Sequence, residues 1–162
     1  MGFTVISPGP LTTIQDLGRN GFQYVGISTS GVLDYRAAVL GNLLVGNKKE
    51  EAVLEVTLIG PILEFKETNI IAITGGDFEA KINEKEVSSY QAILVYKGDT
   101  LSFGMPRNGC RCYIAFAGGM DISYVMESRS TNVRCEFGGF QGRKLKAMDE
   151  ILFRAPRSKL NH

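Results

Sequence analysis

Short apolar segments alternate with turns rich in glycine, proline and asparagine along most of the chain. These segments predict strands at 3–6, 11–15, 53–58, 62–65, 69–74, 78–82, 86–88, 92–96, 100–103, 111–117 and 150–153. The turns at 83–85 and 97–99 are expected to close two hairpins. Short strands that recur every 8–12 residues or so are typical of a barrel or a sandwich.

One amphipathic helix interrupts this pattern between Asp34 and Leu44. Asp34 is a good N-cap residue, and Gly46 is suited to end the helix. Ala37, Leu40 and Leu44 recur at helical spacing and predict the apolar face that packs on the strands. The predicted fold class is therefore mainly β with one or two short helices.

Composition narrows the range of functions. The 162 residues fit a single domain, 1–162, with a change of subdomain near residue 50 left open. The formal net charge is +1, which gives no electrostatic basis for binding nucleic acid. No apolar run is long enough to span a membrane, and the chain opens with no signal-peptide pattern, so we expect a cytoplasmic protein.

Cysteine and histidine usage excludes several kinds of site. Three cysteines do not make a disulfide framework, which also favours a reducing compartment. Cys110 and Cys112 are two positions apart, with Cys110 directly before the predicted strand 111–117, and on one strand they should share a face. His162 is the single histidine, so we expect neither a histidine-based nucleophilic triad nor a metal site.

Two polar segments are candidates for ligand binding. The glycine-rich stretch 16–31 contains Asp16 and Arg19, and Arg19 could clamp a carboxylate through its two-pronged guanidinium. The alternative is a salt bridge inside the loop. Residues 128–131 place three hydroxyls around Arg129, which suits an oxyanion, whereas helix capping with a surface charge is the alternative.

Other polar positions have simpler explanations. Glu55 lies in an apolar strand and is expected to face solvent, with a pocket as the alternative. The charged run 48–51 is expected to be a solvated connector. The glycine pairs at 118–119 and 138–139 do not have the spacing of a phosphate loop, and tight turns explain them better than a nucleotide site.

Several segments, in order along nearly the whole chain, resemble the biotin-dependent carboxyltransferase family, also called the allophanate hydrolase subunit 2 family. They are PGPLTTIQDLGR at 8–19, GNLLVGN at 41–47, LEVTLIGP at 54–61, ITGGDF at 73–78, AGGMD at 117–121, SRST at 128–131 and GGFQGR at 138–143. No single segment is specific, but the ordered set is.

The resemblance implies a cyclophilin-like β-barrel type of fold and a role in an enzyme complex. The family includes the C subunit of the bacterial 5-oxoprolinase, which uses ATP to convert 5-oxoproline to glutamate together with the B and A subunits. One alternative is a carboxyltransferase component that acts on urea or another amide with carboxybiotin. Another is a regulatory binding module that antagonises a kinase inhibitor.

The resemblance also suggests tentative substrate-binding positions, without assigning catalytic residues. They are Gln15, Asp16, Arg19, Asp34, Glu55, Arg129, Ser130, Thr131 and Arg143. Arg19 and Arg129 are the preferred carboxylate or phosphate clamps. Family members are about twice as long, so we expect the isolated chain to be inactive and its uncovered apolar surface to favour a homo-oligomer.

Overall fold

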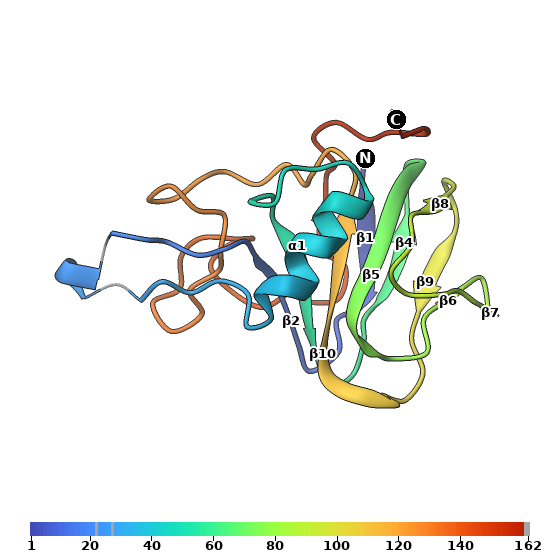
Figure 1. The fold of residues 1–162 in the computed structure, drawn as a ribbon, viewed down its shortest axis with the longest axis horizontal. Coiled ribbons are helices and arrows are strands. Elements are labelled where there is room, and N and C mark those ends of the chain that lie inside the picture. The colour runs from blue at the N-terminus through green and yellow to red at the C-terminus, as the bar shows by residue number, and fades with distance from the viewer. Residues whose placement is uncertain (22, 27, 161–162) are drawn as a thin grey trace.

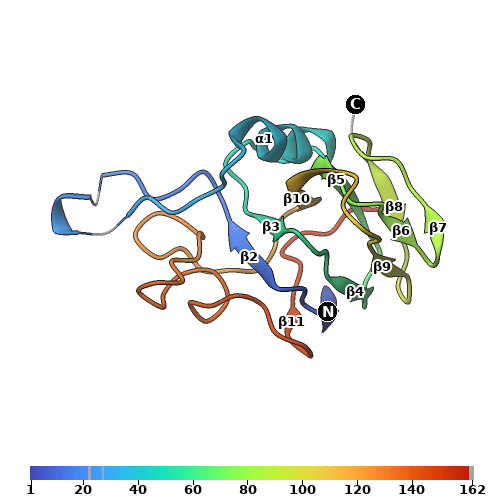
Figure 2. The same cartoon turned by 90° about the horizontal axis from the view of Figure 1, so that it is seen from below.

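The computed structural model describes residues 1–21, 23–26 and 28–160, and it contains two antiparallel sheets (Figures 1 and 2). The six-stranded sheet has the order β11 (Glu150–Ile151), β1 (Phe3–Ser7), β4 (Ile62–Phe65), β9 (Thr100–Ser102), β6 (Lys81–Ile82) and β7 (Lys85–Glu86). The five-stranded sheet has the order β2 (Leu11–Gln15), β3 (Val53–Thr57), β10 (Asn108–Phe116), β5 (Asn69–Asp77) and β8 (Ile93–Val95). The prediction of a mainly β chain is confirmed, although the two sheets remain separate rather than closed.

Apolar side chains from both sheets form the main core. The rings of Phe3 and Phe116 stack at 4.9 Å between centroids, and Phe65 and Phe153 pack around them. The central strands β5 and β10 are buried on both faces, because α1 covers the side turned away from this core. Burial on both faces explains why the sequences of both strands are continuous apolar runs rather than alternating apolar and polar residues.

One α-helix, α1 (Tyr35–Leu44), is present among the described residues. It begins where predicted, with the side chain of Asp34 accepting a hydrogen bond from Ala37 N at 3.1 Å. The predicted apolar face is wrong for Leu40, which is exposed as Leu43 is. Small residues face the sheet instead, because the helix lies close to it. A Cβ added to Gly41 would lie 3.3 Å from the Cβ of Ala115.

One of the two predicted hairpins is present. Strands β6 and β7 pair across a turn in which Asn83 and Glu84 have φ angles of 50° and 69°. The hairpin predicted across 97–99 is wrong, since β8 pairs with β5 while β9 pairs with β4 and β6. The turn at 97–99 therefore carries the chain from one sheet to the other.

Long loops gather beside β2 at one side of the molecule (Figures 1 and 2). They are the segment between β2 and α1, which contains the short 3-10 helix η1 (Gln23–Val25), and the segment between β10 and β11. His162 lies outside the described residues. In the part of the chain that is described, no helix is long and apolar enough to cross a membrane.

Candidate functional site

The buried carboxylate of Asp16 joins the loop after β2 to the loop after β10. Its Oδ1 accepts hydrogen bonds from Ser128 Oγ at 2.6 Å, Ser130 Oγ at 2.7 Å and Gly18 N at 2.9 Å. Its Oδ2 accepts a hydrogen bond from Arg129 N at 2.7 Å. We call this set of contacts the Asp16 junction. It brings together three of the predicted positions, Asp16, Arg129 and Ser130.

Gln15 and Thr131 extend the junction along β2. Gln15 Nε2 donates to Thr131 O at 3.1 Å, and its Oε1 accepts from Gly31 N at 3.0 Å. The hydroxyl of Thr131 donates to Ile14 O at 2.9 Å. Both side chains are buried, so in this conformation they tie the loops together.

Arg19 is fully buried under the second loop. Its Nε donates to Val125 O at 2.8 Å, its Nη2 lies 3.4 Å from Ser128 O, and its guanidinium carbon lies 4.7 Å from the centre of the Phe137 ring. Burial lowers the pKa of Arg19, and the charge of Asp16 works in the opposite direction. A ligand could reach this guanidinium only if the loop moved.

Glu55 faces neither solvent nor a pocket, so the expectation that it points to solvent is wrong. It is buried, and its Oε2 accepts hydrogen bonds from Tyr113 Oη and from Leu33 N, both at 2.8 Å. Tyr113 Oη in turn accepts from Asp34 N at 2.9 Å, and burial raises the pKa of this hydroxyl. The loop that leads into α1 therefore covers Glu55, and Asp34 caps the helix.

Arg143 forms a separate pair with Asp149. Its Nη1 donates to Asp149 Oδ2 at 2.7 Å and its Nη2 to Asp149 Oδ1 at 2.9 Å. The guanidinium carbon also lies 5.2 Å from the centre of the Phe140 ring. This fork is already filled by a carboxylate of the same chain.

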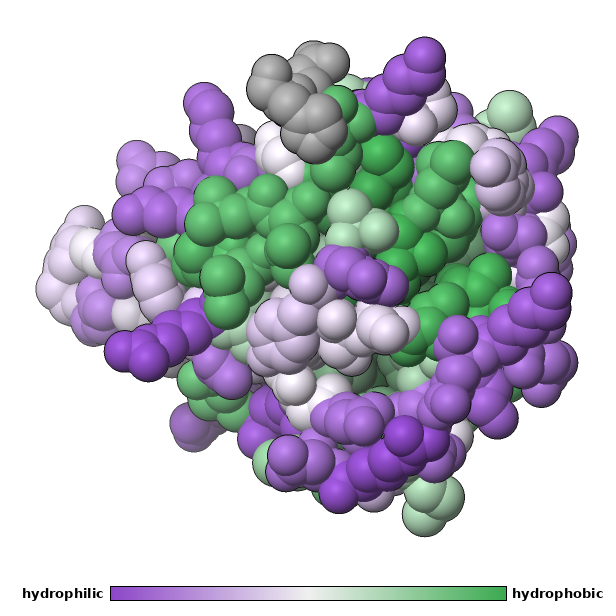
Figure 3. All heavy atoms as spheres, turned by 45° about the vertical axis from the view of Figure 1, so that its right-hand side comes forward, coloured by the Kyte–Doolittle hydropathy of each residue, from purple (hydrophilic) through white to green (hydrophobic). Residues whose placement is uncertain are grey.

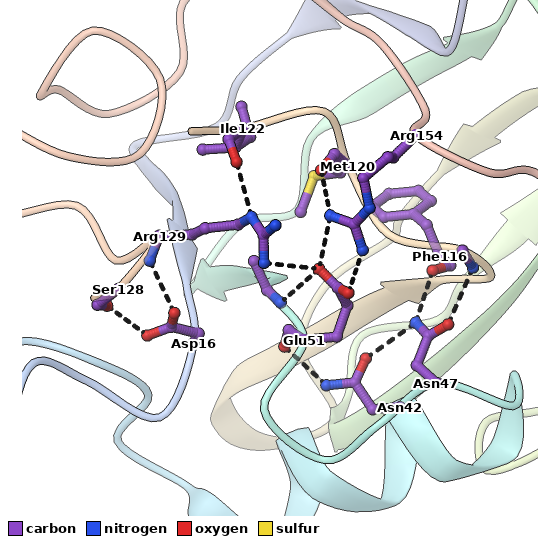
Figure 4. Close-up of polar contacts among 12 residues, drawn as sticks. Asp16, Asn42, Asn47, Glu51, Phe116, Met120, Ile122, Ser128, Arg129 and Arg154 are labelled. Carbon is purple, nitrogen blue, oxygen red and sulfur yellow. Dashed lines mark hydrogen bonds and ion pairs between the residues drawn. The ribbon is translucent and has the colours of Figure 1, made fainter. Parts of the chain in front are cut away.

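Arg129 connects the Asp16 junction to a group of charged side chains that the sequence does not predict (Figure 4). Its Nη1 lies 3.5 Å from Glu51 Oε1, and Arg154 Nη2 pairs with Glu51 Oε2. Only 11% of the Glu51 side chain is exposed, so the prediction of a solvated connector at 48–51 is wrong at its last residue. Lys48 and Glu50 are exposed as expected.

A pocket of about 490 Å³ opens beside these charges. We call it the Arg129 pocket, and it is lined by Gly46, Asn47, Lys48, Glu51, Gly118, Tyr124, Arg129, Arg154, Ala155 and Arg157. Four cationic side chains and one carboxylate face it, which suits an anionic ligand. In the sequence, Arg154 and Arg157 stand out only as members of a basic C-terminal segment, with nothing to mark them as ligand-binding residues.

The glycine pairs act as tight turns. Gly118 N donates to Asn47 Oδ1 at 2.9 Å, Gly119 N to Phe116 O at 3.0 Å and Gly139 N to Arg129 O at 3.1 Å. These three amides are not free to bind a phosphate.

Cysteines and carboxylates form no metal-binding group among the described residues. Cys110 is exposed and Cys112 is buried, although the two are alternate positions of β10. The register of β10 against β5 shifts between Asn108 and Cys112, so the strand does not keep one face covered along its whole length.

The two-sheet fold is shared with carboxyltransferase proteins. The family described as carboxyltransferase domain, subdomain A and B, matches residues 25–162. A solved structure of the Kluyveromyces lactis urea carboxylase superposes with a TM-score of 0.93 at 36% identity, covering 98% of this chain and 14% of that one. The chain belongs to this carboxyltransferase-domain family.

Two of the curated relatives are named as the C subunit of 5-oxoprolinase and as a urea amidolyase. The chain is 40% identical to the C subunit of 5-oxoprolinase from Escherichia coli over 147 residues, which are 91% of this chain and 47% of that protein. It is 39% identical to a urea amidolyase of Lachancea kluyveri over 155 residues, or 95% of this chain and 8% of the relative. The chain thus spans less than half the length of either relative.

Proposed function

We propose that this chain is part of a subunit of an ATP-dependent 5-oxoprolinase complex, which cleaves 5-oxoproline to glutamate. The observation that carries the proposal is its 40% identity to the C subunit of 5-oxoprolinase across 91% of the chain. The charge of the Arg129 pocket supports the same choice. 5-Oxoproline carries a carboxylate that several nearby cations attract, whereas urea itself is uncharged and can only accept hydrogen bonds from them.

The chain contributes binding and positioning in this proposal. The Asp16 junction fixes the backbone of Arg129, and Glu51 and the Tyr124 ring hold its side chain, so the guanidinium is oriented before a ligand arrives. A guanidinium that is already oriented loses little conformational freedom when it binds an anionic group of a ligand.

The nucleotide is proposed to bind on another component of the complex. The amides at Gly118, Gly119 and Gly139 already have acceptors within the chain, so these turns do not fit a phosphate group. The B and A subunits of 5-oxoprolinase are the partners expected to complete the complex.

A carboxyltransferase component that acts on urea or another amide with carboxybiotin is the second candidate. The likeness to the Kluyveromyces lactis urea carboxylase, with its TM-score of 0.93, favours it. A biotin carboxylase and a biotin carrier encoded nearby would support this candidate over the first. The regulatory antagonist of a kinase inhibitor remains a third candidate, which predicts tight pairing with the B subunit and no turnover.

The test is conversion of 5-oxoproline to glutamate in the presence of ATP and the partner subunits, with and without this chain. Turnover that requires the chain supports the proposal and shows that this length suffices within the complex. Turnover restored only by a full-length relative supports the family role and locates further necessary residues in the rest of that protein. No turnover with either protein would count against the 5-oxoprolinase assignment.

A further inference from the structure

Arg129 is a nine-tenths buried arginine that still has unused hydrogen-bond donors. Its Nε donates to Ile122 O at 2.6 Å, and its guanidinium carbon lies 3.8 Å from the centre of the Tyr124 ring. Nη1 makes only the 3.5 Å ion pair with Glu51, and Nη2 has no polar partner among the described residues. Nη2 is not fully enclosed by protein atoms, so a ligand that enters the pocket can supply the acceptor that this charged donor lacks.

Two further arginines face the same pocket from the segment after β11. Arg154 pairs with Glu51 and also lies 3.3 Å from Met120 O. Arg157 uses Nη1 to reach Gly46 O at 3.1 Å, while its Nε and Nη2 donate to none of the residues that the structure describes. Free donors from two chain segments therefore converge on one pocket.

We propose that the Arg129 pocket binds the carboxylate of a small acid, with Arg129 as the main contact and Arg154 and Arg157 adding charge. A planar carboxylate matches the fork of a guanidinium, and the carboxylate of Glu51 already meets Arg154 in that manner, with Nη1 at 3.4 Å from Oε1 and Nη2 paired with Oε2. The inference rests on the proposed function only in naming 5-oxoproline as the acid.

Glu51 is a positioning residue that also competes with the ligand. Its carboxylate holds Arg129 and Arg154 together and cancels part of their charge (Figure 4). Removing that charge while keeping a hydrogen-bonding amide should leave the arginines more attractive to an anion. Glu51→Gln is therefore expected to tighten carboxylate binding by about 3-fold or more, whereas a merely structural Glu51 would weaken it.

Calorimetric titration of the 162-residue chain tests the proposal without partner subunits or turnover. The probes are 5-oxoproline, acetate, inorganic phosphate and urea. We expect saturable binding of 5-oxoproline that is tighter than that of phosphate, weaker binding of acetate and no binding of urea. Arg129→Gln should weaken 5-oxoproline binding by about 10-fold or more, and Arg129→Lys should recover only part of the loss because it lacks the fork.

Arg107→Gln is the matched control, because Arg107 pairs with Glu79 and Glu86 on another surface and is half exposed. Arg154→Gln and Arg157→Gln keep the test decisive if a change at buried Arg129 prevents folding, which thermal unfolding would reveal. Preferred binding of phosphate, equal binding of urea, or 5-oxoproline binding unchanged in the arginine variants would overturn the site. Binding, with no hydrolysis in the complex by either this chain or a full-length relative, would refute the proposed function alone, whereas chain-dependent hydrolysis without binding would refute this site alone.

Discussion

Asp16 and Ser130 exchange two hydrogen bonds although they lie 114 positions apart in the chain. Ser130 Oγ donates to Asp16 Oδ1 at 2.7 Å and accepts from Asp16 N at 2.9 Å. Both residues are buried, so the pair fixes the loop after β2 against the loop after β10. Because Arg129 precedes Ser130, the same contact sets one wall of the Arg129 pocket.

Asp16→Asn is expected to lower the free energy of unfolding by about 2–4 kcal/mol. The amide replaces one carboxylate oxygen with an NH₂ group, which cannot accept the hydrogen bonds that the oxygen accepted from Ser128, Ser130 or Arg129. Urea unfolding measures the change. Asp121→Asn, at an exposed position, is the control and should stay within about 0.5 kcal/mol of the natural chain. Equal unfolding midpoints for the two variants would show that the junction adds little stability.

Local signals are sufficient to predict where most strands lie, although several strand ends differ, and they also predict the start of α1. The N-cap at Asp34 depends on a residue three positions away, and the strands depend on short apolar runs. The pairing of β8 and β9 depends instead on which sheet offers an open edge, which no local pattern specifies. The face of α1 was likewise decided by how closely Gly41 lets the helix approach the sheet.

The candidate site is likewise predictable only in part, because some of its contacts join residues that lie far apart in the chain. Residues 128–131 and Asp16 stand out in the sequence as polar positions in loops, and the structure brings them together. Glu51 was missed because its partner Arg154 lies 103 positions away, and nothing in the run 48–51 distinguishes a paired carboxylate from a solvated one. The burial of Glu55 is not predictable from its strand alone, because the loop that covers it comes from a different part of the chain.

The stability of the chain should fall in acid partly through Asp149. Burial would raise the pKa of Asp149, but hydrogen bonds from Arg143 and from Lys146 N outweigh it, and the pKa lies below the ordinary 3.8. The folded state therefore takes up this proton less readily than the unfolded state. The stabilisation is complete above pH 3.8 and is lost as the pH falls through the lowered value.

Urea unfolding at about pH 6 and at about pH 3 measures this loss. Asp149→Asn should show a smaller decrease between the two conditions than the natural chain. Arg143→Gln should flatten the dependence in the same way, since it removes the partner that lowers the pKa. An identical decrease in all three proteins would contradict the stabilising role of the Arg143–Asp149 pair. Arg143 would then be available for its predicted contact with substrate.

The three cysteines should differ in reactivity. Cys110 and Cys135 are exposed, whereas burial raises the pKa of the Cys112 thiol to about 12. The thiolate is the reactive form, so a thiol reagent at about pH 8 should modify two groups quickly and the third only after unfolding. Cys110→Ser should reduce the fast phase to one group, while Cys112→Ala should leave it at two. A fast third thiol in the natural chain would mean that β10 opens readily.

Exposed leucines on α1 are expected to promote self-association. Leu40 and Leu43 are 45% and 57% exposed on the helix side turned away from the sheet, and apolar patches occupy much of the face seen in Figure 3. Burying such side chains against a second copy removes apolar area from water. Light scattering across a concentration series measures the association. The mass of the natural chain should rise above 17.7 kDa with concentration, whereas the double variant Leu40→Gln, Leu43→Gln should keep the mass of one chain. Met105→Gln, at an exposed methionine outside α1, should associate as the natural chain does, and a double variant that also does so would place the contact elsewhere.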